Sequence, residues 1–221
     1  MQSTQIIGLI ISALPILIAI TFHEVSHGYV AYKLGDPTAK FAGRLTLNPI
    51  PHIDLFGTII LPLMLYYVTG GKFVFGYAKP VPINPMNFKK PREGMAISAA
   101  AGPVTNMLLA TASFIILRGL IMPAAAVSPE TVTNTVLRPL AMIMQSSIVV
   151  NVVLGVFNMI PMPPLDGGRV LTGLLPYKQA MLFSRIEPFG FIIVIVLIYS
   201  GIANHIIMPV IDFFLRLFQL Y

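Results

Sequence analysis

The chain has 221 residues, of which 56% are hydrophobic and only 10% charged, and its mean hydropathy is +0.84. These values exclude an ordinary soluble domain and indicate a polytopic membrane protein. The net charge of +6 does not indicate nucleic-acid binding, because the basic residues are scattered over short loops, where they orient a protein in the bilayer. The absence of cysteine excludes a disulfide framework and a thiolate metal site.

The first predicted span covers about residues 5–34 and contains the pentapeptide His-Glu-Val-Ser-His at 23–27. It lacks the basic start and the cleavage site of a signal peptide, so we expect it to stay as a span. Gly35-Asp36-Pro37 ends it, and three basic residues surround that end, Lys33, Lys40 and Arg44. Basic residues mark the cytoplasmic side, so the pentapeptide should lie within the membrane but nearer the cytoplasm.

Residues 41–85 do not have the pattern of an ordinary membrane-crossing helix. Residues 41–54 read as an irregular loop at the membrane surface, and residues 55–71 are uncharged but interrupted by glycine and proline. Because this second segment is short for a span and basic residues flank both of its ends, we expect it to re-enter the membrane. Residues 72–85 have the alternating, proline-interrupted pattern of an edge β-hairpin.

The second half of the chain predicts four further spans. A second span is expected at about 94–120 and a third at 138–160, joined by an external loop at 122–135. Residues 161–168 hold three prolines and two glycines and cannot continue a helix, and a short helix should follow at 169–175. The last two spans are expected at 188–200 and 203–220, as a hairpin around Gly201.

Together these elements predict an all-α polytopic membrane protein with about five to six transmembrane helices and a small re-entrant or β-hairpin element. No polar stretch is long enough for an appended soluble domain, so we expect one integral-membrane domain over residues 1–221. Its catalytic core should cover about 5–176, with the C-terminal helical hairpin at about 186–220. We expect it in a prokaryotic cell membrane, with its active site opening toward the cytoplasm; the oligomeric state stays open.

The pentapeptide at 23–27 predicts a metal site. Positions i and i+4 share one face of a helix, so His23 and His27 can hold a single ion while Glu24 sits beside it. A carboxylate near hydrocarbon depth costs roughly 2.5–3.5 kcal/mol on insertion scales, which favours a functional reason for its presence.

A catalytic zinc usually has three protein ligands, so one more is needed. Asp166 is the preferred candidate, because it is the acid placed in a helix break between apolar runs. His52 stays open, either as a ligand or as a hydrogen-bond partner of one. Asn106 and Asn158 also lie in apolar helices, where each could donate to a substrate backbone or oxyanion; the alternative for both is hydrogen bonding between helices.

Five motifs in order resemble those of one known family: HEVSH at 23–27, GRLTLNP with PHID at 43–54, GYAKPVPINP at 76–85, AGPVTN at 101–106 and LDGG at 165–168. The set resembles the site-2 protease family of intramembrane zinc metalloproteases, in a minimal form without PDZ or CBS domains. The resemblance implies one Zn²⁺ per chain held by His23, His27 and Asp166, and Glu24 as the catalytic acid/base. It also implies transmembrane proteins as substrates, an edge hairpin that pairs with them, and polar roles for Asn106 and Asn158.

The function predicted is zinc-dependent cleavage of peptide bonds in or near transmembrane segments, as in regulated intramembrane proteolysis. One alternative is a metal-ion transporter or channel, but its polar residues should follow a path through both leaflets, whereas these cluster toward one side. A second is an inactive relative that only binds membrane partners, which the intact Glu24 and ligand set argue against. A third is a membrane-anchored protease acting on soluble peptides.

Overall fold

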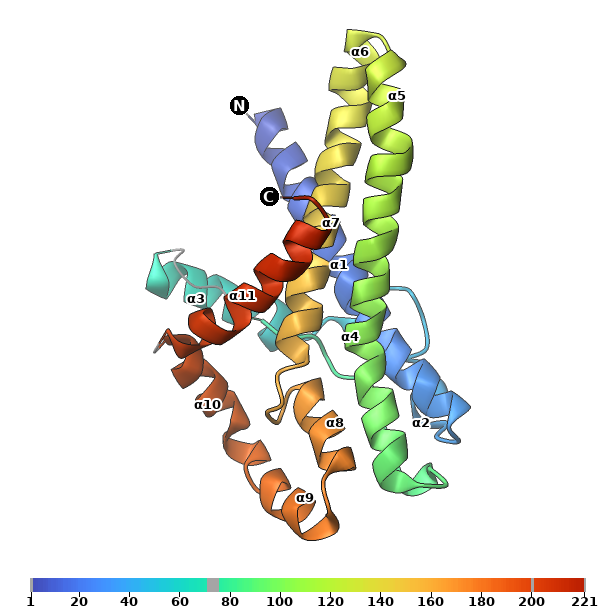
Figure 1. Cartoon of the computed structure of the whole chain (residues 1–221), viewed down its shortest axis with the longest axis vertical. Helices are drawn as coiled ribbons and strands as arrows, with labels where there is room; N and C mark the ends of the chain where they lie inside the picture. Colours follow the sequence, from blue (N-terminus) through green and yellow to red (C-terminus); the bar gives the residue numbers. More distant parts are fainter. Residues whose placement is uncertain (1, 71–75, 200, 221) are drawn as a thin grey trace.

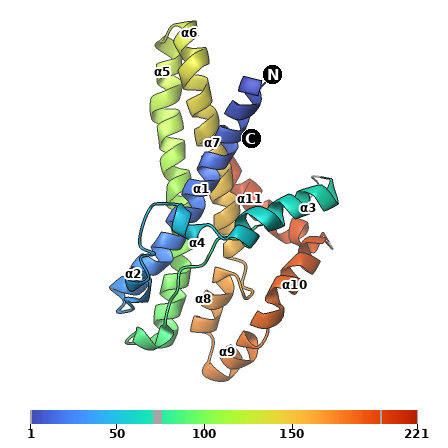
Figure 2. The ribbon, with the colours of Figure 1, turned by 180° about the vertical axis from the view of Figure 1, so that it is seen from behind.

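The computed structural model describes residues 2–70, 76–199 and 201–220, and its centre is a packed group of three helices. Helix α1 (Gln2–Lys33) packs against α4 (Pro91–Ile116) and α7 (Arg138–Asn158), which also pack against each other. Figures 1 and 2 show α4 and α7 side by side, with α1 crossing them. This crossing brings the predicted metal-binding face of α1 against α4.

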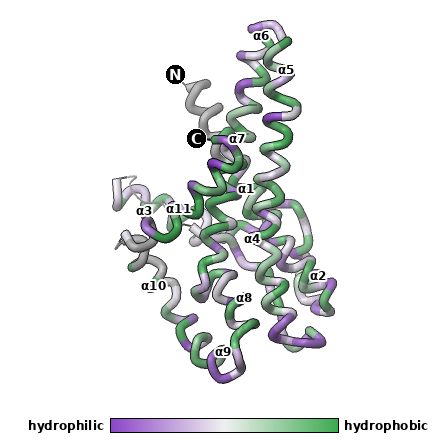
Figure 3. The backbone as a smooth tube through the Cα atoms, in the orientation of Figure 1, coloured by the Kyte–Doolittle hydropathy of each residue, from purple (hydrophilic) through white to green (hydrophobic). Residues whose placement is uncertain are grey.

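Two stretches of continuous helix are long and apolar enough to cross a membrane. One runs through α4, η4 (Leu117–Ile121) and α5 (Met122–Val127), and the other through α6 (Glu130–Val132), η5 (Thr133–Leu137) and α7. Figure 3 shows hydrophobic residues along the middle of these helices and hydrophilic residues around α2 (Thr38–Phe41) and α9 (Tyr177–Ser184). The all-helical class is confirmed for the described residues, whereas the count of five to six spans is not.

Both helices extend further than predicted, because wide π-turns absorb their prolines. The expected loop at 122–135 is mostly helical and breaks only at Ser128 and Pro129. A proline cannot donate to the carbonyl four residues before it and clashes with that carbonyl. In the described residues each π-segment ends two residues before a proline, namely η4 before Pro123, η5 before Pro139 and η2 (Leu55–Ile60) before Pro62. The wider turn removes this conflict, so the helix continues.

The segment after the first surface loop forms one short apolar helix. It consists of η2 followed by α3 (Leu61–Thr69), and it ends at Gly70, whose φ of +62° is left-handed. Fifteen residues are too few for an ordinary crossing, as predicted. Of the predicted edge hairpin, residues 71–75 lie outside the described part of the chain, and residues 76–84 are extended but not assigned as a strand.

Two polar loop segments are tied to the end of α1 by Asp36. This fully buried carboxylate accepts hydrogen bonds from the Asn84 amide, at 2.7 Å, from the Asn87 side chain, at 2.7 Å, and from Thr38. Burial raises the pKa of Asp36, but these hydrogen bonds outweigh it and hold the pKa below its ordinary value. The extended segment before Asn84 is thereby fixed to the end of α1.

The C-terminal half begins after the proline-rich break with α8 (Asp166–Leu174), α9 and α10 (Glu187–Tyr199). Gly201, with φ of +77°, lies between α10 and α11 (Ile202–Leu217), at the position where the turn was expected. The helix α9 was not predicted. A buried cluster joins α11 to the central helices and is formed by Ala110, Leu117, Ile148, Val152, Ile211, Leu215 and Phe218.

Candidate metal centre

Three buried side chains from two distant parts of the chain converge at the contact of α1 with α4. His23 and His27 lie one turn apart on α1, with their Nε2 atoms 3.0 Å from each other. Asp166, the first residue of α8, places its Oδ2 3.0 Å from His23 Nε2 and 3.2 Å from His27 Nε2. In the described chain these three residues form a group able to hold a metal ion.

The two glycines after Asp166 allow its helix to start against the preceding turn. A Cβ on Gly167 would lie 2.3 Å from the Met159 carbonyl oxygen, and one on Gly168 would lie 2.3 Å from the Pro163 nitrogen. These neighbours are backbone atoms, which have little freedom to move away. The LDGG motif is therefore required for the close turn that brings Asp166 to the histidines.

The tautomers of both histidines follow from what their Nδ1 atoms contact. His27 Nδ1 lies 2.7 Å from the Ser98 carbonyl oxygen, and His23 Nδ1 lies 2.6 Å from Asn106 Oδ1. Carbonyl oxygens only accept hydrogen bonds, so each Nδ1 donates a proton and each Nε2 is left with its lone pair. Such contacts orient metal-binding histidines in proteins generally.

The group fits a zinc ion. Both Nε2 atoms and Asp166 Oδ2 then present lone pairs to one another, and Oδ2 is buried without a hydrogen-bond donor among the described residues. Three such atoms repel unless a cation lies between them. Zinc bonds of about 2.0–2.1 Å in tetrahedral geometry put ligand atoms about 3.3–3.4 Å apart, close to the separations observed here.

Gly102 of α4 forms one wall of the centre. A Cβ at this position would lie 2.4 Å from His27 Nε2 and 2.6 Å from His23 Nε2. Any side chain there would displace the imidazoles, so the glycine keeps the space open.

Glu24 is held by the extended segment that follows α3. Its Oε2 accepts a hydrogen bond of 2.9 Å from the Val81 amide. Pro80 and Pro82 flank Val81 and have no amide hydrogen, so Val81 supplies the donor of this tripeptide. One carboxylate oxygen is thus engaged by the backbone of the segment in which the edge hairpin is expected.

The same segment is also held by the first surface loop and by η2. Tyr77 donates its amide to the Gly57 carbonyl, at 3.0 Å, and Lys79 donates to the His52 carbonyl, at 3.0 Å. The Arg44 guanidinium donates to the Lys79 carbonyl at 2.7 Å. Residues 77–81 are therefore held extended beside Glu24.

The remaining predicted residues are placed differently from one another. Both polar atoms of the Asn106 side chain are hydrogen-bonded within the protein. Its Oδ1 accepts from His23, and its Nδ2 donates to Asn151 at 2.8 Å and to the Ala19 carbonyl at 3.4 Å. It is therefore placed to hold His23, and its contact with Asn151 is the hydrogen bond between helices that the sequence left as an alternative. Asn158 donates to Leu154 of its own helix, at 3.0 Å.

His52 has no hydrogen bond to a ligand among the described residues. It is 2% exposed, and its Nε2 donates to the Thr46 carbonyl at 3.0 Å. The geometry thus leaves the predicted role of His52 at the metal without a supporting contact.

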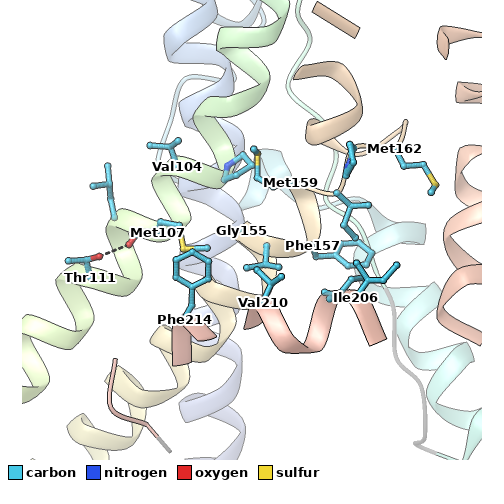
Figure 4. A pocket seen from close by; sticks show the side chains of 16 residues that line it. Val104, Met107, Thr111, Gly155, Phe157, Met159, Met162, Ile206, Val210 and Phe214 are labelled. Carbon is cyan, nitrogen blue, oxygen red and sulfur yellow. Dashed lines mark hydrogen bonds between the residues drawn. The ribbon is translucent and has the colours of Figure 1, made fainter. Parts of the chain in front are cut away.

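An apolar pocket of about 830 Å³ lies beside the centre, between α4, α7 and α11 (Figure 4). Figure 4 shows Val104 and Met107 of α4, Phe157 of α7 and Val210 of α11 around it. Its wall includes Pro103, the neighbour of Gly102, and residues 159–162, which lead into the turn before Asp166. A pocket with this lining suits an apolar occupant.

The sequence did not indicate that Ser98, Gly102, Asn151 and Val81 lie at or behind the metal centre. The prolines around Val81, and Asn151 in the third span, are unusual enough to be noticed in the sequence. Neither feature shows which residue its backbone or side chain contacts. The role of the Ser98 carbonyl has no signal in the sequence, because every residue has a carbonyl.

Residues 11–201 match the model of one family, described as Peptidase family M50. A Bacillus subtilis (strain 168) protein named "Putative zinc metalloprotease YwhC" is 39% identical over 208 residues, which cover 92% of this chain and 89% of that protein. Proteins named "Putative zinc metalloprotease Rip2" from Mycolicibacterium smegmatis and Mycobacterium tuberculosis H37Rv are each 26% identical over 188 residues, 85% of this chain and 66% of each relative. No solved structure matches the chain.

Proposed function

This chain belongs to Peptidase family M50 and is a zinc metalloendopeptidase, and we propose that it cleaves membrane proteins in or next to their transmembrane segments. The observation that carries the proposal is the convergence of His23, His27 and Asp166 against α4, which is part of a helix of membrane-spanning length and composition. Peptide bonds of a substrate that lie within the bilayer can enter an active site at this position. Regulated intramembrane proteolysis is the process in which such an activity is used.

We assign the ligands to His23, His27 and Asp166. Zinc bound by these two imidazoles and one carboxylate would supply Lewis acidity toward the scissile carbonyl and would lower the pKa of a bound water.

Glu24 is the general acid/base of the proposed reaction. Its carboxylate takes a proton from the attacking water and later delivers it to the leaving amine. The Val81 amide, which binds Oε2, orients the carboxylate so that the other oxygen can accept the proton. Asn158, near the turn that carries Asp166, is the proposed donor to the substrate backbone or oxyanion.

The substrate must be locally unwound, because a transmembrane helix uses its own peptide groups in internal hydrogen bonds. The extended residues 76–84 support binding of such an unwound strand by β-augmentation. Their position next to Glu24 would bring the bound strand to the reacting carboxylate. The adjoining apolar pocket suits the apolar side chains of a transmembrane segment.

The membrane arrangement proposed includes the shorter helices. We infer that α1 and the α10–α11 hairpin also enter the bilayer, with the α2 end of α1 on the cytoplasmic side. Basic residues around that end, Lys33, Lys40 and Arg44, support this orientation.

The test is reconstitution of the purified protein in liposomes with a panel of single-span substrates. Wild type should cleave some of them, and Glu24→Gln should keep its zinc and lose cleavage, because glutamine cannot accept the proton. A zinc-loaded Glu24→Gln protein with wild-type activity would refute the assignment of Glu24. Cleavage confined to soluble peptides would instead favour a membrane-anchored protease with a different substrate class.

A further inference from the structure

A line of buried hydrogen bonds runs from His23 along the α4–α7 contact, away from the metal centre. Asn106 Nδ2 donates to Asn151 Oδ1 at 2.8 Å, and Asn151 Nδ2 donates to the Ser147 carbonyl at 2.8 Å and to its hydroxyl at 3.3 Å. The Ser147 and Ser113 hydroxyls are 2.8 Å apart. We call Asn106, Asn151 and Ser147 the α4–α7 relay. Both asparagines are 0% exposed.

The Ser147 carbonyl, at the end of the relay away from His23, determines which group donates and which accepts in each hydrogen bond. The Ser147 carbonyl only accepts, so Asn151 must present its NH₂ group to it and its Oδ1 to Asn106. Asn106 must then donate with Nδ2, which leaves its Oδ1 facing His23. The Ala19 carbonyl, on the Nδ2 side of Asn106, requires the same orientation.

The other tautomer of His23 would be destabilised, because it requires these hydrogen bonds to reverse. If His23 carried its proton on Nε2, its Nδ1 would need a donor, and Asn106 would have to turn its amide over. Its Oδ1 would then face Asn151 Oδ1, and a compensating turn of Asn151 would bring its Oδ1 against the Ser147 carbonyl. Two buried oxygens facing each other lose a hydrogen bond and repel.

We propose that Asn151 is a positioning residue for the metal centre: through Asn106 it holds His23 in the tautomer whose Nε2 lone pair faces the metal. The proposal rests on the assignment of His23 as a zinc ligand. His27 needs no such relay, because its Nδ1 donates directly to the Ser98 carbonyl of the backbone. The tautomer of His23 instead depends on two side chains that substitution can change.

The first experiment measures zinc affinity by chelator competition on the purified full-length chain. Asn151→Leu, of similar size, should weaken zinc binding about 10- to 100-fold, the usual effect of removing a hydrogen-bond partner behind a ligand. Ser113→Ala should change it less than about threefold, since the Ser147 carbonyl that sets the direction is retained. Should Asn151→Leu fail to fold, Asn151→Ala takes its place with the same expectation.

A double-mutant cycle separates this role from general packing. An aspartate at position 106 has acceptor oxygens only, so it accepts from His23 Nδ1 whether or not Asn151 is present. In the Asn106→Asp background, Asn151→Leu should therefore change zinc affinity less than about threefold. A loss of equal size in both backgrounds would show that Asn151 only supports the fold, and would overturn the proposal.

A spectroscopic measurement gives a readout that does not depend on tolerance of a buried aspartate. The chain has only four histidines, so ¹⁵N labelling of their rings and comparison with His23→Ala can identify the His23 signals. In the zinc-loaded wild type the His23 Nδ1–H signal should show the short hydrogen bond to Asn106 Oδ1, and Asn151→Leu should shift that signal toward a weaker hydrogen bond. An unchanged spectrum would overturn the relay. If His23→Ala keeps wild-type zinc affinity, the metal centre itself is wrong; if only Asn151→Leu does, the relay alone fails.

Discussion

Replacing Gly102 by alanine tests whether the metal position is a space kept open by one missing side chain. The added Cβ would lie 2.4 Å from His27 Nε2, whereas ordinary contact begins at 3.4 Å, so the imidazole must move by 3.4 − 2.4 = 1.0 Å. Zinc sites tolerate ligand displacements of only about 0.2 Å. Loss of His27 as a ligand should weaken zinc binding at least about 100-fold, or about 2.8 kcal/mol.

Gly119→Ala is the matched control, because it lies further along the same continuous helix and a Cβ there would meet nothing within 4 Å. It should keep wild-type zinc affinity and slightly stabilise the helix, by about 0.5–1 kcal/mol. The assay is chelator competition together with circular dichroism of the metal-free proteins, which checks that Gly102→Ala remains folded. A folded Gly102→Ala protein that binds zinc within about threefold of wild type would refute the reasoning.

Three further substitutions test the surrounding structure. Val81→Pro removes the amide that holds Glu24 and should lower kcat about 10- to 100-fold at unchanged zinc content, whereas Val81→Ile should not; equal kcat values would contradict this. Gly168→Ala should lose zinc, because its Cβ would strike backbone before Asp166, and a zinc-loaded variant would contradict that turn. Asp36→Asn should lower the free energy of unfolding by about 1–3 kcal/mol at pH 7. Because folding lowers the pKa of Asp36, this difference in thermal unfolding should start to shrink as the pH falls below about 4 and disappear only at lower pH, where the folded carboxyl is protonated; a pH-independent difference would contradict it.

The three converging residues could be singled out in the sequence because their chemistry is local or unusual. The i, i+4 spacing of His23 and His27 already places both on one helix face. Asp166 stood out as an acid in a helix break between apolar runs, and close packing at Gly167 and Gly168 explains how the chain brings it back to α1. These are features that a pattern of residues can reveal.

Other parts depended on contacts that no pattern specifies. The loop expected at 122–135 is mostly helix, because a π-turn before Pro123 accommodates the proline, and sequence alone does not show where the helical register will widen. For Asn106 the sequence left two roles open, donation to the substrate or hydrogen bonding between helices, and it could not show that Asn151 and Ala19, from two other helices, turn its amide toward His23. Long-range packing decided both outcomes.

The most direct test of the account is the zinc content of the purified chain and of its three ligand variants. Wild type and Glu24→Gln should each carry about one zinc per chain, while His23→Ala, His27→Ala and Asp166→Ala should each carry almost none after dialysis against a weak chelator. A folded Asp166→Ala protein that retains one zinc would contradict the central claim, that α8 completes a metal centre begun on α1.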